Sequence, residues 1–211
     1  MRIREKCGIM HSYKLPDAGC GKVTHMNETI KHILSRRSTR AFLPEQIKEE
    51  DLQTLLQAAC FAPSAHNDQP WHFTVVQDQD LLMEVNLAAK AVGRSSKDAI
   101  LRKMSSSERL HIFYQAPTVI FVAGEKTALM PETDCAAAVE NMLIAAEAMG
   151  IGSCWIGLAS FAFDGDQSEP LSKKLLIPEN YQPFYAVSLG YKKVEAVGAL
   201  PRRENTIAYV R

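Results

Sequence analysis

The chain has 211 residues, of which 46% are hydrophobic, and its 24 lysines and arginines balance 24 aspartates and glutamates. This length supports one sizeable hydrophobic core, so we expect a single α+β or α/β domain. The formal net charge of zero excludes a global electrostatic attraction to nucleic acid or to an anionic membrane.

The five cysteines are widely spaced and none forms a Cys-x-x-Cys pair. This pattern favours a reducing compartment over a disulfide framework. No apolar run reaches the roughly 18 residues of a membrane span, and residues 1–27 lack the apolar core of a signal peptide. We therefore expect a cytoplasmic protein.

Residues 1–25 show neither helical nor strand periodicity, whereas a helical pattern begins directly after Met26. Residues 1–25 are therefore either an extension outside the folded core or an ordered arm that packs on it. The folded domain is expected over residues 26–211.

Helices and strands alternate after this point. A helix is predicted over residues 27–35, and a second one carries its apolar residues on one face, namely Leu52, Leu55, Leu56 and Ala59. The apolar run Trp71–Val76 predicts a buried strand, residues 79–92 a helix, and Thr118–Ala123 another buried strand. Both strands look central to a sheet.

The segment Gly93–Ser107 is polar, with weak apolar patterning and four basic residues, Arg94, Lys97, Arg102 and Lys103. It is either an ordinary solvated loop or, as we expect, a mobile flap over a binding site. Ser105 and Glu108 have capping-box spacing, which predicts a helix that ends near Ala116–Pro117.

The longest predicted helix is Pro131–Met149, whose many alanines allow another helix to approach closely. Ser153–Leu158 and Ala186–Gly190 follow as a third and a fourth strand. The tail ends on apolar residues, including Ile207 and Val210, which need a partner surface.

Two familiar site types are unsupported by the spacing of the residues. Gly150, Gly152 and Gly157 lie after a helix and before a strand, the reverse of the order that a dinucleotide-binding loop needs. His66 and His72 have no cysteine or carboxylate at metal-ligand spacing, so ordinary polar roles are favoured for them.

The basic turn Arg36–Arg40 could be only a solvated helix end, but its chemistry also suits a phosphate group. Guanidinium groups are permanently charged bidentate donors, and Ser38 adds a hydroxyl. Arg202 and Arg203 offer a second clamp of the same kind.

The loop between the second helix and the first strand is braced by Pro63 and Pro70. These prolines restrict the backbone, so the polar groups of Ser64, Asn67 and Gln69 lose little freedom when they bind a ligand. Together with the basic clusters, this loop predicts a site for a phosphorylated, planar cofactor.

Five segments, in this order, resemble the nitroreductase family of flavin enzymes. The resemblance covers roughly residues 26–211. It rests on Arg36-Arg37-Ser38-Thr39-Arg40-Ala41-Phe42, Pro63-Ser64-Ala65-His66-Asn67-Asp68-Gln69-Pro70-Trp71, Asp134 with the alanine-rich helix after it, Gly150-Ile151-Gly152-Ser153-Cys154-Trp155-Ile156-Gly157, and Pro201-Arg202-Arg203.

The resemblance implies an α+β fold with a mostly antiparallel central sheet flanked by helices, in an intertwined homodimer with two FMN sites at its interface. The basic turn, with Arg202 or Arg203, would hold the phosphate and neighbouring groups. The Pro63–Gln69 loop would line the flavin from the partner side, and Ile156–Gly157 would approach its N5 atom. The implied FMN-binding residues are Arg36, Arg37, Ser38, Arg40, Pro63, Ser64, Ala65, Asn67, Gln69, Ile156, Gly157, Arg202 and Arg203.

The function that this resemblance implies is an FMN-dependent oxidoreductase. It would use NAD(P)H to reduce small, planar, electron-poor acceptors, such as nitroaromatics or quinones, by ping-pong hydride transfer. No side chain is expected to act as a catalyst, because the flavin carries the chemistry. The alternatives are a specialised flavin enzyme acting by dehalogenation or flavin destruction, and a non-catalytic FMN-binding redox sensor.

Overall fold

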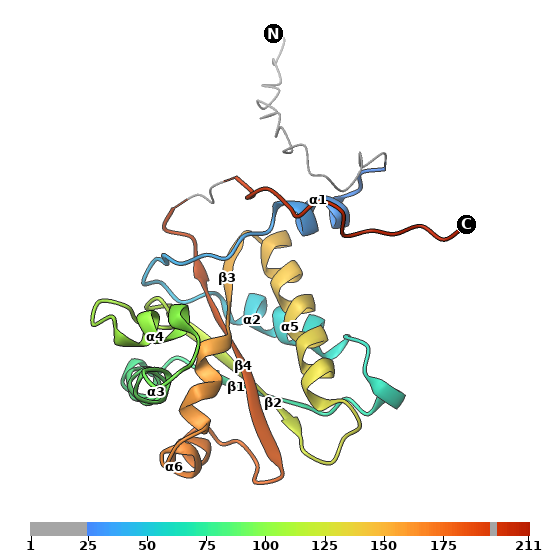
Figure 1. The fold of residues 1–211 in the computed structure, drawn as a ribbon. Helices are drawn as coiled ribbons and strands as arrows, with labels where there is room; N and C mark the ends of the chain where they lie inside the picture. Colours follow the sequence, from blue (N-terminus) through green and yellow to red (C-terminus); the bar gives the residue numbers. More distant parts are fainter. Residues whose placement is uncertain (1–24, 195–197) are drawn as a thin grey trace.

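The computed structural model describes residues 25–194 and 198–211, so almost all of the predicted N-terminal arm over residues 1–25 lies outside the described residues. Figure 1 shows a sheet with helices on both of its faces. The helices are α1 (Glu28–Ser35), α2 (Glu49–Cys60), α3 (Gln79–Gly93), α4 (Ala99–Ser106), α5 (Pro131–Ala148) and α6 (Ser168–Lys174), with short 3₁₀ helices η1 (Ala65–Asn67) and η2 (Gly157–Phe163). The strands are β1 (Trp71–Val76), β2 (Thr118–Glu125), β3 (Ile151–Ile156) and β4 (Tyr181–Tyr191).

The four strands are antiparallel and lie in the order β1-β2-β4-β3. β2 is central and buried over nearly its whole length. β1, which was predicted to be central, is an edge strand among the described residues, and most of it is only half-buried. An apolar run can arise from helices that cover the faces of a strand, so it does not require a neighbouring strand on both sides.

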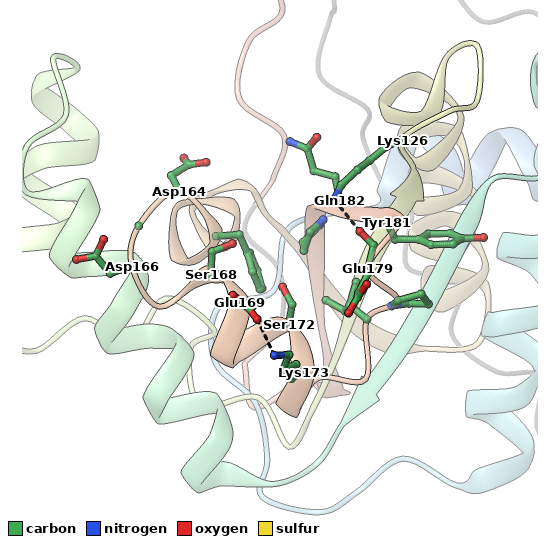
Figure 2. A pocket seen from close by; sticks show the side chains of 15 residues that line it. Lys126, Asp164, Asp166, Ser168, Glu169, Ser172, Lys173, Glu179, Tyr181 and Gln182 are labelled. Atoms are coloured by element: carbon green, nitrogen blue, oxygen red, sulfur yellow. Dashed lines mark hydrogen bonds and ion pairs between the residues drawn. The ribbon is translucent and has the colours of Figure 1, made fainter.

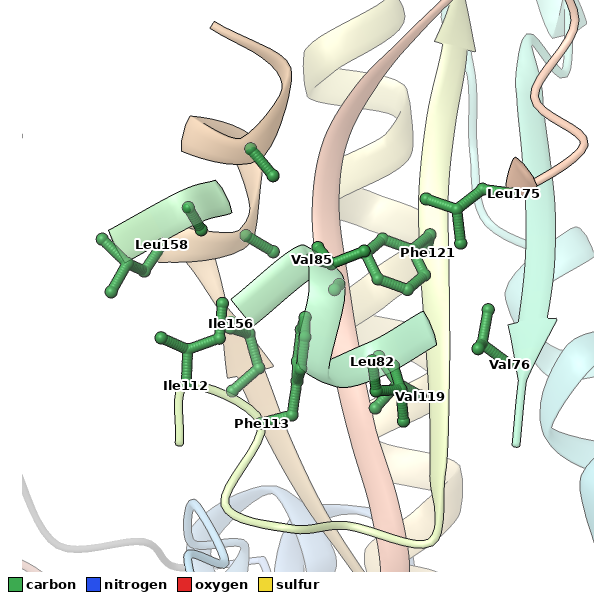
Figure 3. Close-up of a cluster of buried hydrophobic side chains, with 14 of the residues drawn as sticks. Val76, Leu82, Val85, Ile112, Phe113, Val119, Phe121, Ile156, Leu158 and Leu175 are labelled. Atoms are coloured by element: carbon green, nitrogen blue, oxygen red, sulfur yellow. The ribbon is translucent and has the colours of Figure 1, made fainter. Parts of the chain in front are cut away.

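Alternate residues of β2 point to opposite faces of the sheet and enter two separate cores. Val119 and Phe121 face α3 and η2, where Figure 3 shows them packed among aliphatic side chains and Phe113. Ile120 and Val122 face α2 and α5 instead. The sheet therefore separates an α3/η2 side from an α2/α5 side.

The segment after α1 is held against the end of the sheet by backbone contacts. Ser38 forms a parallel bridge with Ser153, and the Thr39 N–H donates to the Ser153 carbonyl at 2.8 Å. Phe42 then bridges to Lys192, just beyond β4. These contacts fix the basic turn beside β3.

The predicted flap Gly93–Ser107 contains helix α4, which begins after Asp98. The Asp98 carboxylate accepts hydrogen bonds from two backbone N–H groups of the first turn, a typical N-cap. The predicted helix that follows it is wrong: residues 107–117 form turns. Tyr114 and Gln115 have positive φ values of 56° and 54°, which no right-handed helix contains.

The boundaries of the last two strands also differ from their prediction. β3 begins at Ile151 rather than Ser153, because Gly150, with φ of +71°, ends the preceding helix abruptly. β4 spans eleven residues from Tyr181 and is longer than predicted, and the short helix α6 was not predicted. Among the described residues, no helix is long and apolar enough to cross a membrane.

Candidate functional site

A cavity of about 350 Å³ opens where β3 ends and η2 begins. Its walls come from the basic turn, α4, the turns before β2 and the β3–η2 junction. Most of the side chains are apolar or aromatic, and one is cationic. The lining residues are Arg40, Leu101, Met104, Ile112, Tyr114, Cys154, Trp155, Ile156, Gly157, Leu158 and Phe161.

The buried Cys154 thiol of this cavity lies next to the basic turn. Burial raises the pKa of the Cys154 thiol. Arg40, Ser38 and Arg36 all act in the opposite direction on that pKa. Arg40 lines the cavity itself, and Ser38 is held next to Cys154 by its bridge to Ser153. Their spacing of two is that of an extended segment with one face turned toward the cavity. The cavity therefore has a cationic end.

Arg37 points to the other side of the same segment. Its Nη1 donates to the Leu34 carbonyl at 2.9 Å and to the Arg36 carbonyl at 2.7 Å. Its Nε is buried and has no hydrogen-bond partner within the described residues. Arg37 thus caps the end of α1, and the structure does not bring its guanidinium together with those of Arg36 and Arg40.

Tyr114 forms the wall opposite the basic turn. The guanidinium carbon of Arg40 lies 5.8 Å from the centroid of the Tyr114 ring, a cation–π distance. Two side chains of α3 hold residues 110–112, which lie just before Tyr114 in the chain. The Asn86 side chain accepts a hydrogen bond from the Ile112 N–H at 2.9 Å, and the buried Lys90 Nζ donates to the Leu110 carbonyl at 2.9 Å. The aromatic wall is therefore fixed to the core through α3.

The predicted flap contributes to the same cavity. Leu101 and Met104, three residues apart on α4, supply apolar lining. Arg102 does not extend freely toward a ligand, since its Nη1 donates to the Ser96 carbonyl at 2.7 Å. Lys97 and Lys103 are exposed. Part of the segment thus lines the cavity, and its role as a mobile flap stays a prediction.

The Pro63–Gln69 loop is stabilised by its own polar groups. The Ser64 hydroxyl accepts from the Gln69 N–H at 3.0 Å, and the Asp134 carboxylate of α5 accepts from the Ala65 N–H at 3.1 Å. His66, Asn67 and Gln69 all have positive φ, an uncommon conformation for residues other than glycine. Asn67 and Gln69 are exposed, so their amide groups reach solvent.

This loop lies far from the cavity within one chain. Across the sheet, Ile156 of β3 pairs with Ala186 of β4, Ala186 pairs with Phe121 of β2, and Phe121 pairs with Thr74 of β1. Three strand spacings, or about 14 Å, therefore separate Ile156 from β1. The loop precedes β1 and contacts α5, whereas Ile156 belongs to the core on the α3/η2 side. The two groups of predicted residues thus occupy opposite edges and opposite faces of the sheet.

Arg202 and Arg203 form a third group. They lie in the exposed tail of residues 198–211, which extends from the end of the molecule that carries α1 (Figure 1). The structure does not bring them to the cavity.

A larger hollow of about 510 Å³ lies between the loop after η2, α6 and the start of β4 (Figure 2). Its two lysines are already engaged. Lys173 Nζ lies 2.6 Å from Glu169 Oε1, and Lys126 Nζ donates to the Glu179 carbonyl at 2.8 Å. No arginine and none of the predicted binding residues lines this hollow. The cavity at β3 is therefore the candidate site.

The family model of the nitroreductase family matches residues 33–191, more than half of the chain. The chain belongs to the nitroreductase family. A protein of Archaeoglobus fulgidus, provisionally named an NADH dehydrogenase/NAD(P)H nitroreductase, is 37% identical over 174 residues, which cover 81% of this chain and 88% of the relative.

Two solved nitroreductases with bound FMN share the fold. The structure from Bacteroides fragilis has a TM-score of 0.80 and 35% identity, and the match covers 88% of this chain and 100% of that chain. The structure from Desulfitobacterium hafniense has a TM-score of 0.79 and 32% identity, with 89% and 100% covered. These likenesses confirm the predicted nitroreductase fold with its antiparallel sheet.

In this nitroreductase-family chain, sequence reasoning missed most of the apolar wall of the cavity. The spacing of Leu101 and Met104 is a short apolar helical face that could have been noticed within the polar segment. Tyr114 could not be predicted as a wall residue, because no sequence pattern indicates a positive φ at a tyrosine.

Within the described residues, no group of three or more possible metal-ligating side chains comes together.

Proposed function

We propose that the protein is an FMN-dependent oxidoreductase that uses NAD(P)H to reduce small, planar, electron-poor acceptors such as nitroaromatics or quinones. Membership of the nitroreductase family and the names of its relatives support an NAD(P)H-dependent flavin enzyme. The observation that carries the proposal is the cavity, which combines apolar and aromatic walls with a cationic end.

The residues present fit FMN, which joins a flat ring system to a phosphate. Arg36, Ser38 and Arg40 supply donors suited to the phosphate and the polar chain that carries it. Leu101, Met104, Ile112 and Leu158, with Tyr114, offer apolar contact to a ring. The exposed Gly157 starts η2 and would meet no atom within 4 Å if it carried a Cβ, so the backbone there has space for a close ligand.

The chemistry that bound FMN supplies is hydride uptake from NAD(P)H followed by delivery of electrons to an acceptor. The protein binds and orients the reactants around this chemistry. Cys154 is a poor nucleophile, since burial raises its thiol pKa and keeps it protonated near neutral pH. The apolar wall limits the access of water, and the permanently charged Arg40 favours electron-rich groups at its end of the cavity.

We further propose that the complete site needs two copies of the chain. The Pro63–Gln69 loop cannot reach the cavity of its own chain, because it lies at the opposite edge of the sheet. The exposed apolar residues of the tail, including Ile207 and Val210, are suited to cover a partner. In a homodimer with twofold symmetry, the loop of one protomer would face the cavity of the other.

Steady-state kinetics with flavin-loaded protein tests the proposed activity. NADH or NADPH oxidation is measured without oxygen, with a nitroaromatic, a quinone and a halogenated phenol as separate acceptors. We expect turnover with the first two and parallel double-reciprocal lines, as in a ping-pong reaction. Release of halide alone would favour the specialised alternative. Tight FMN binding without turnover of any acceptor would favour a redox sensor.

A further inference from the structure

The Glu147 carboxylate links the end of α1, which leads into the basic turn, to the segment just after β4. Glu147, in the last turn of α5, accepts a hydrogen bond from the Ser35 hydroxyl at 3.1 Å through Oε1. Its Oε2 lies 2.9 Å from Lys192 Nζ. The Glu147 and Lys192 side chains are only 15% and 20% exposed, so this ion pair is more shielded from solvent than a typical surface pair.

The hydrogen bond between Ser35 and Glu147 fixes the backbone just before Arg36. Ser35 is the last residue of α1 and directly precedes Arg36. Helix α1 has eight residues and none of them is buried, so packing in the core contributes little to its position. The Ser35–Glu147 hydrogen bond therefore supplies a directional anchor at the end of α1 where the basic turn begins.

The second contact fixes the far end of the same turn. Lys192 forms a backbone bridge with Phe42, and the Lys193 N–H donates to the Ala41 carbonyl at 3.0 Å. Glu147 thus holds the entry to the basic turn through Ser35 and its exit through Lys192. The intervening bridge between Ser38 and Ser153 sets the middle of the turn.

We propose that Glu147 is a positioning residue for recognition of the monophosphate group of the flavin, a role that rests on the proposed FMN-dependent function. By bracing both ends of the turn, it holds Arg36 and Ser38 in the geometry that a phosphate requires. Its negative charge is offset by Lys192, so the turn remains cationic. The chain would then prefer FMN over riboflavin, which has the same ring without the phosphate.

A comparison of FMN with riboflavin separates this role from a general contribution to folding. The full-length protein is stripped of flavin, and dissociation constants for both ligands are measured by quenching of flavin fluorescence. Glu147→Ala removes both contacts, whereas Glu147→Gln keeps an acceptor for Ser35 and removes the ion pair. Glu169→Gln makes the same chemical change at an exposed ion pair with Lys173 on α6 and is the control for a change remote from the basic turn.

We expect Glu147→Ala to weaken FMN roughly fivefold to tenfold and to change riboflavin affinity less than about twofold, with a smaller FMN effect in Glu147→Gln. Equal losses for both ligands would overturn the inference, and so would unchanged FMN binding. Tighter FMN binding in Glu147→Gln would also overturn it, since that result means that only the negative charge matters. A wild-type protein that binds neither flavin would instead overturn the proposed function itself. If Glu147→Ala does not fold, Glu147→Gln and Ser35→Ala decide the question.

Discussion

Gly93 and Ser105 touch so closely that a Cβ atom added to Gly93 would lie 2.1 Å from the Ser105 Oγ. Ser105 is fully buried, and its hydroxyl has no hydrogen-bond partner within the described residues. The contact joins the end of α3 to α4, the helix that carries two residues of the cavity wall.

We expect Gly93→Ala to push α4 away from α3, because the new Cβ would also lie 3.0 Å from the Ser105 Cβ and 3.2 Å from the Phe161 ring, contacts that rotation of the hydroxyl does not relieve. Overpacking of this kind typically lowers the free energy of unfolding by about 1–3 kcal/mol. Denaturant unfolding measures the change. Gly198→Ala is the control, since a Cβ there would meet no atom within 4 Å. Equal stability of the two variants would show that α4 is free to move.

Arg36 and Arg37 are neighbours with different expected roles. Arg36→Ala should weaken FMN binding roughly tenfold, because it removes a charged donor from the cationic end of the cavity. Arg37→Met should mainly lower thermal stability, since its guanidinium caps α1 through two backbone carbonyls. Flavin titration and thermal unfolding of both variants separate these effects. A greater loss of FMN affinity in the Arg37 variant would reverse the assignment.

Deleting Ala208–Arg211 should shift the protein from dimer to monomer while leaving each folded core intact. These residues are exposed in the single chain, so their removal costs no packing there. Sedimentation equilibrium gives the dissociation constant of the dimer, and absorbance gives its flavin content. A stable wild-type monomer loaded with flavin would contradict both the dimer and the shared site.

Lys97 and Lys103 are the two exposed lysines of the segment that carries α4. If they attract the anionic donor, Lys97→Gln with Lys103→Gln should slow flavin reduction at low NAD(P)H concentration and flatten its salt dependence. Stopped-flow measurement of the second-order rate constant tests this expectation. Lys48→Gln just before α2, combined with Lys173→Gln on α6, removes the same number of exposed positive charges elsewhere and serves as the control. An unchanged rate and salt slope would make the segment ordinary surface.

The sequence was sufficient for elements whose local pattern agrees with their environment. β1 has the predicted boundaries Trp71–Val76, and α5 ends one residue before its predicted end. In α5, the helical spacing of Cys135, Ala138 and Met142 agrees with their burial. In β1, the apolar run gave the boundaries, although the strand is mostly half-buried at the sheet edge. The polar segment before β2 was harder, because the helical residues of α4 face a cavity rather than a core and its apolar stripe is short.

Placement of the site residues depends on contacts that are distant in the sequence. Arg36 and Arg37 are chemically alike, and no local pattern reveals that Arg37 bonds to carbonyls at the end of α1 whereas the charge of Arg36 acts on Cys154. Likewise, no local pattern reveals that the Pro63–Gln69 loop and Ile156 lie at opposite edges of the sheet, since strand order is a property of the whole fold. The family resemblance implied only that this loop lines the flavin from the partner side.

The opposite-edge placement of the Pro63–Gln69 loop and Ile156 also has a genetic consequence. In a symmetric dimer, a chain defective in its basic turn and a chain defective in its loop would each, when alone, form two weakened sites. A mixed dimer would contain one site in which both defects meet and one site in which neither is present. At FMN concentrations too low to fill the weakened sites of either variant, co-expression of Arg36→Ala and Asn67→Ala chains should therefore restore flavin reduction, so that two damaged alleles would complement each other.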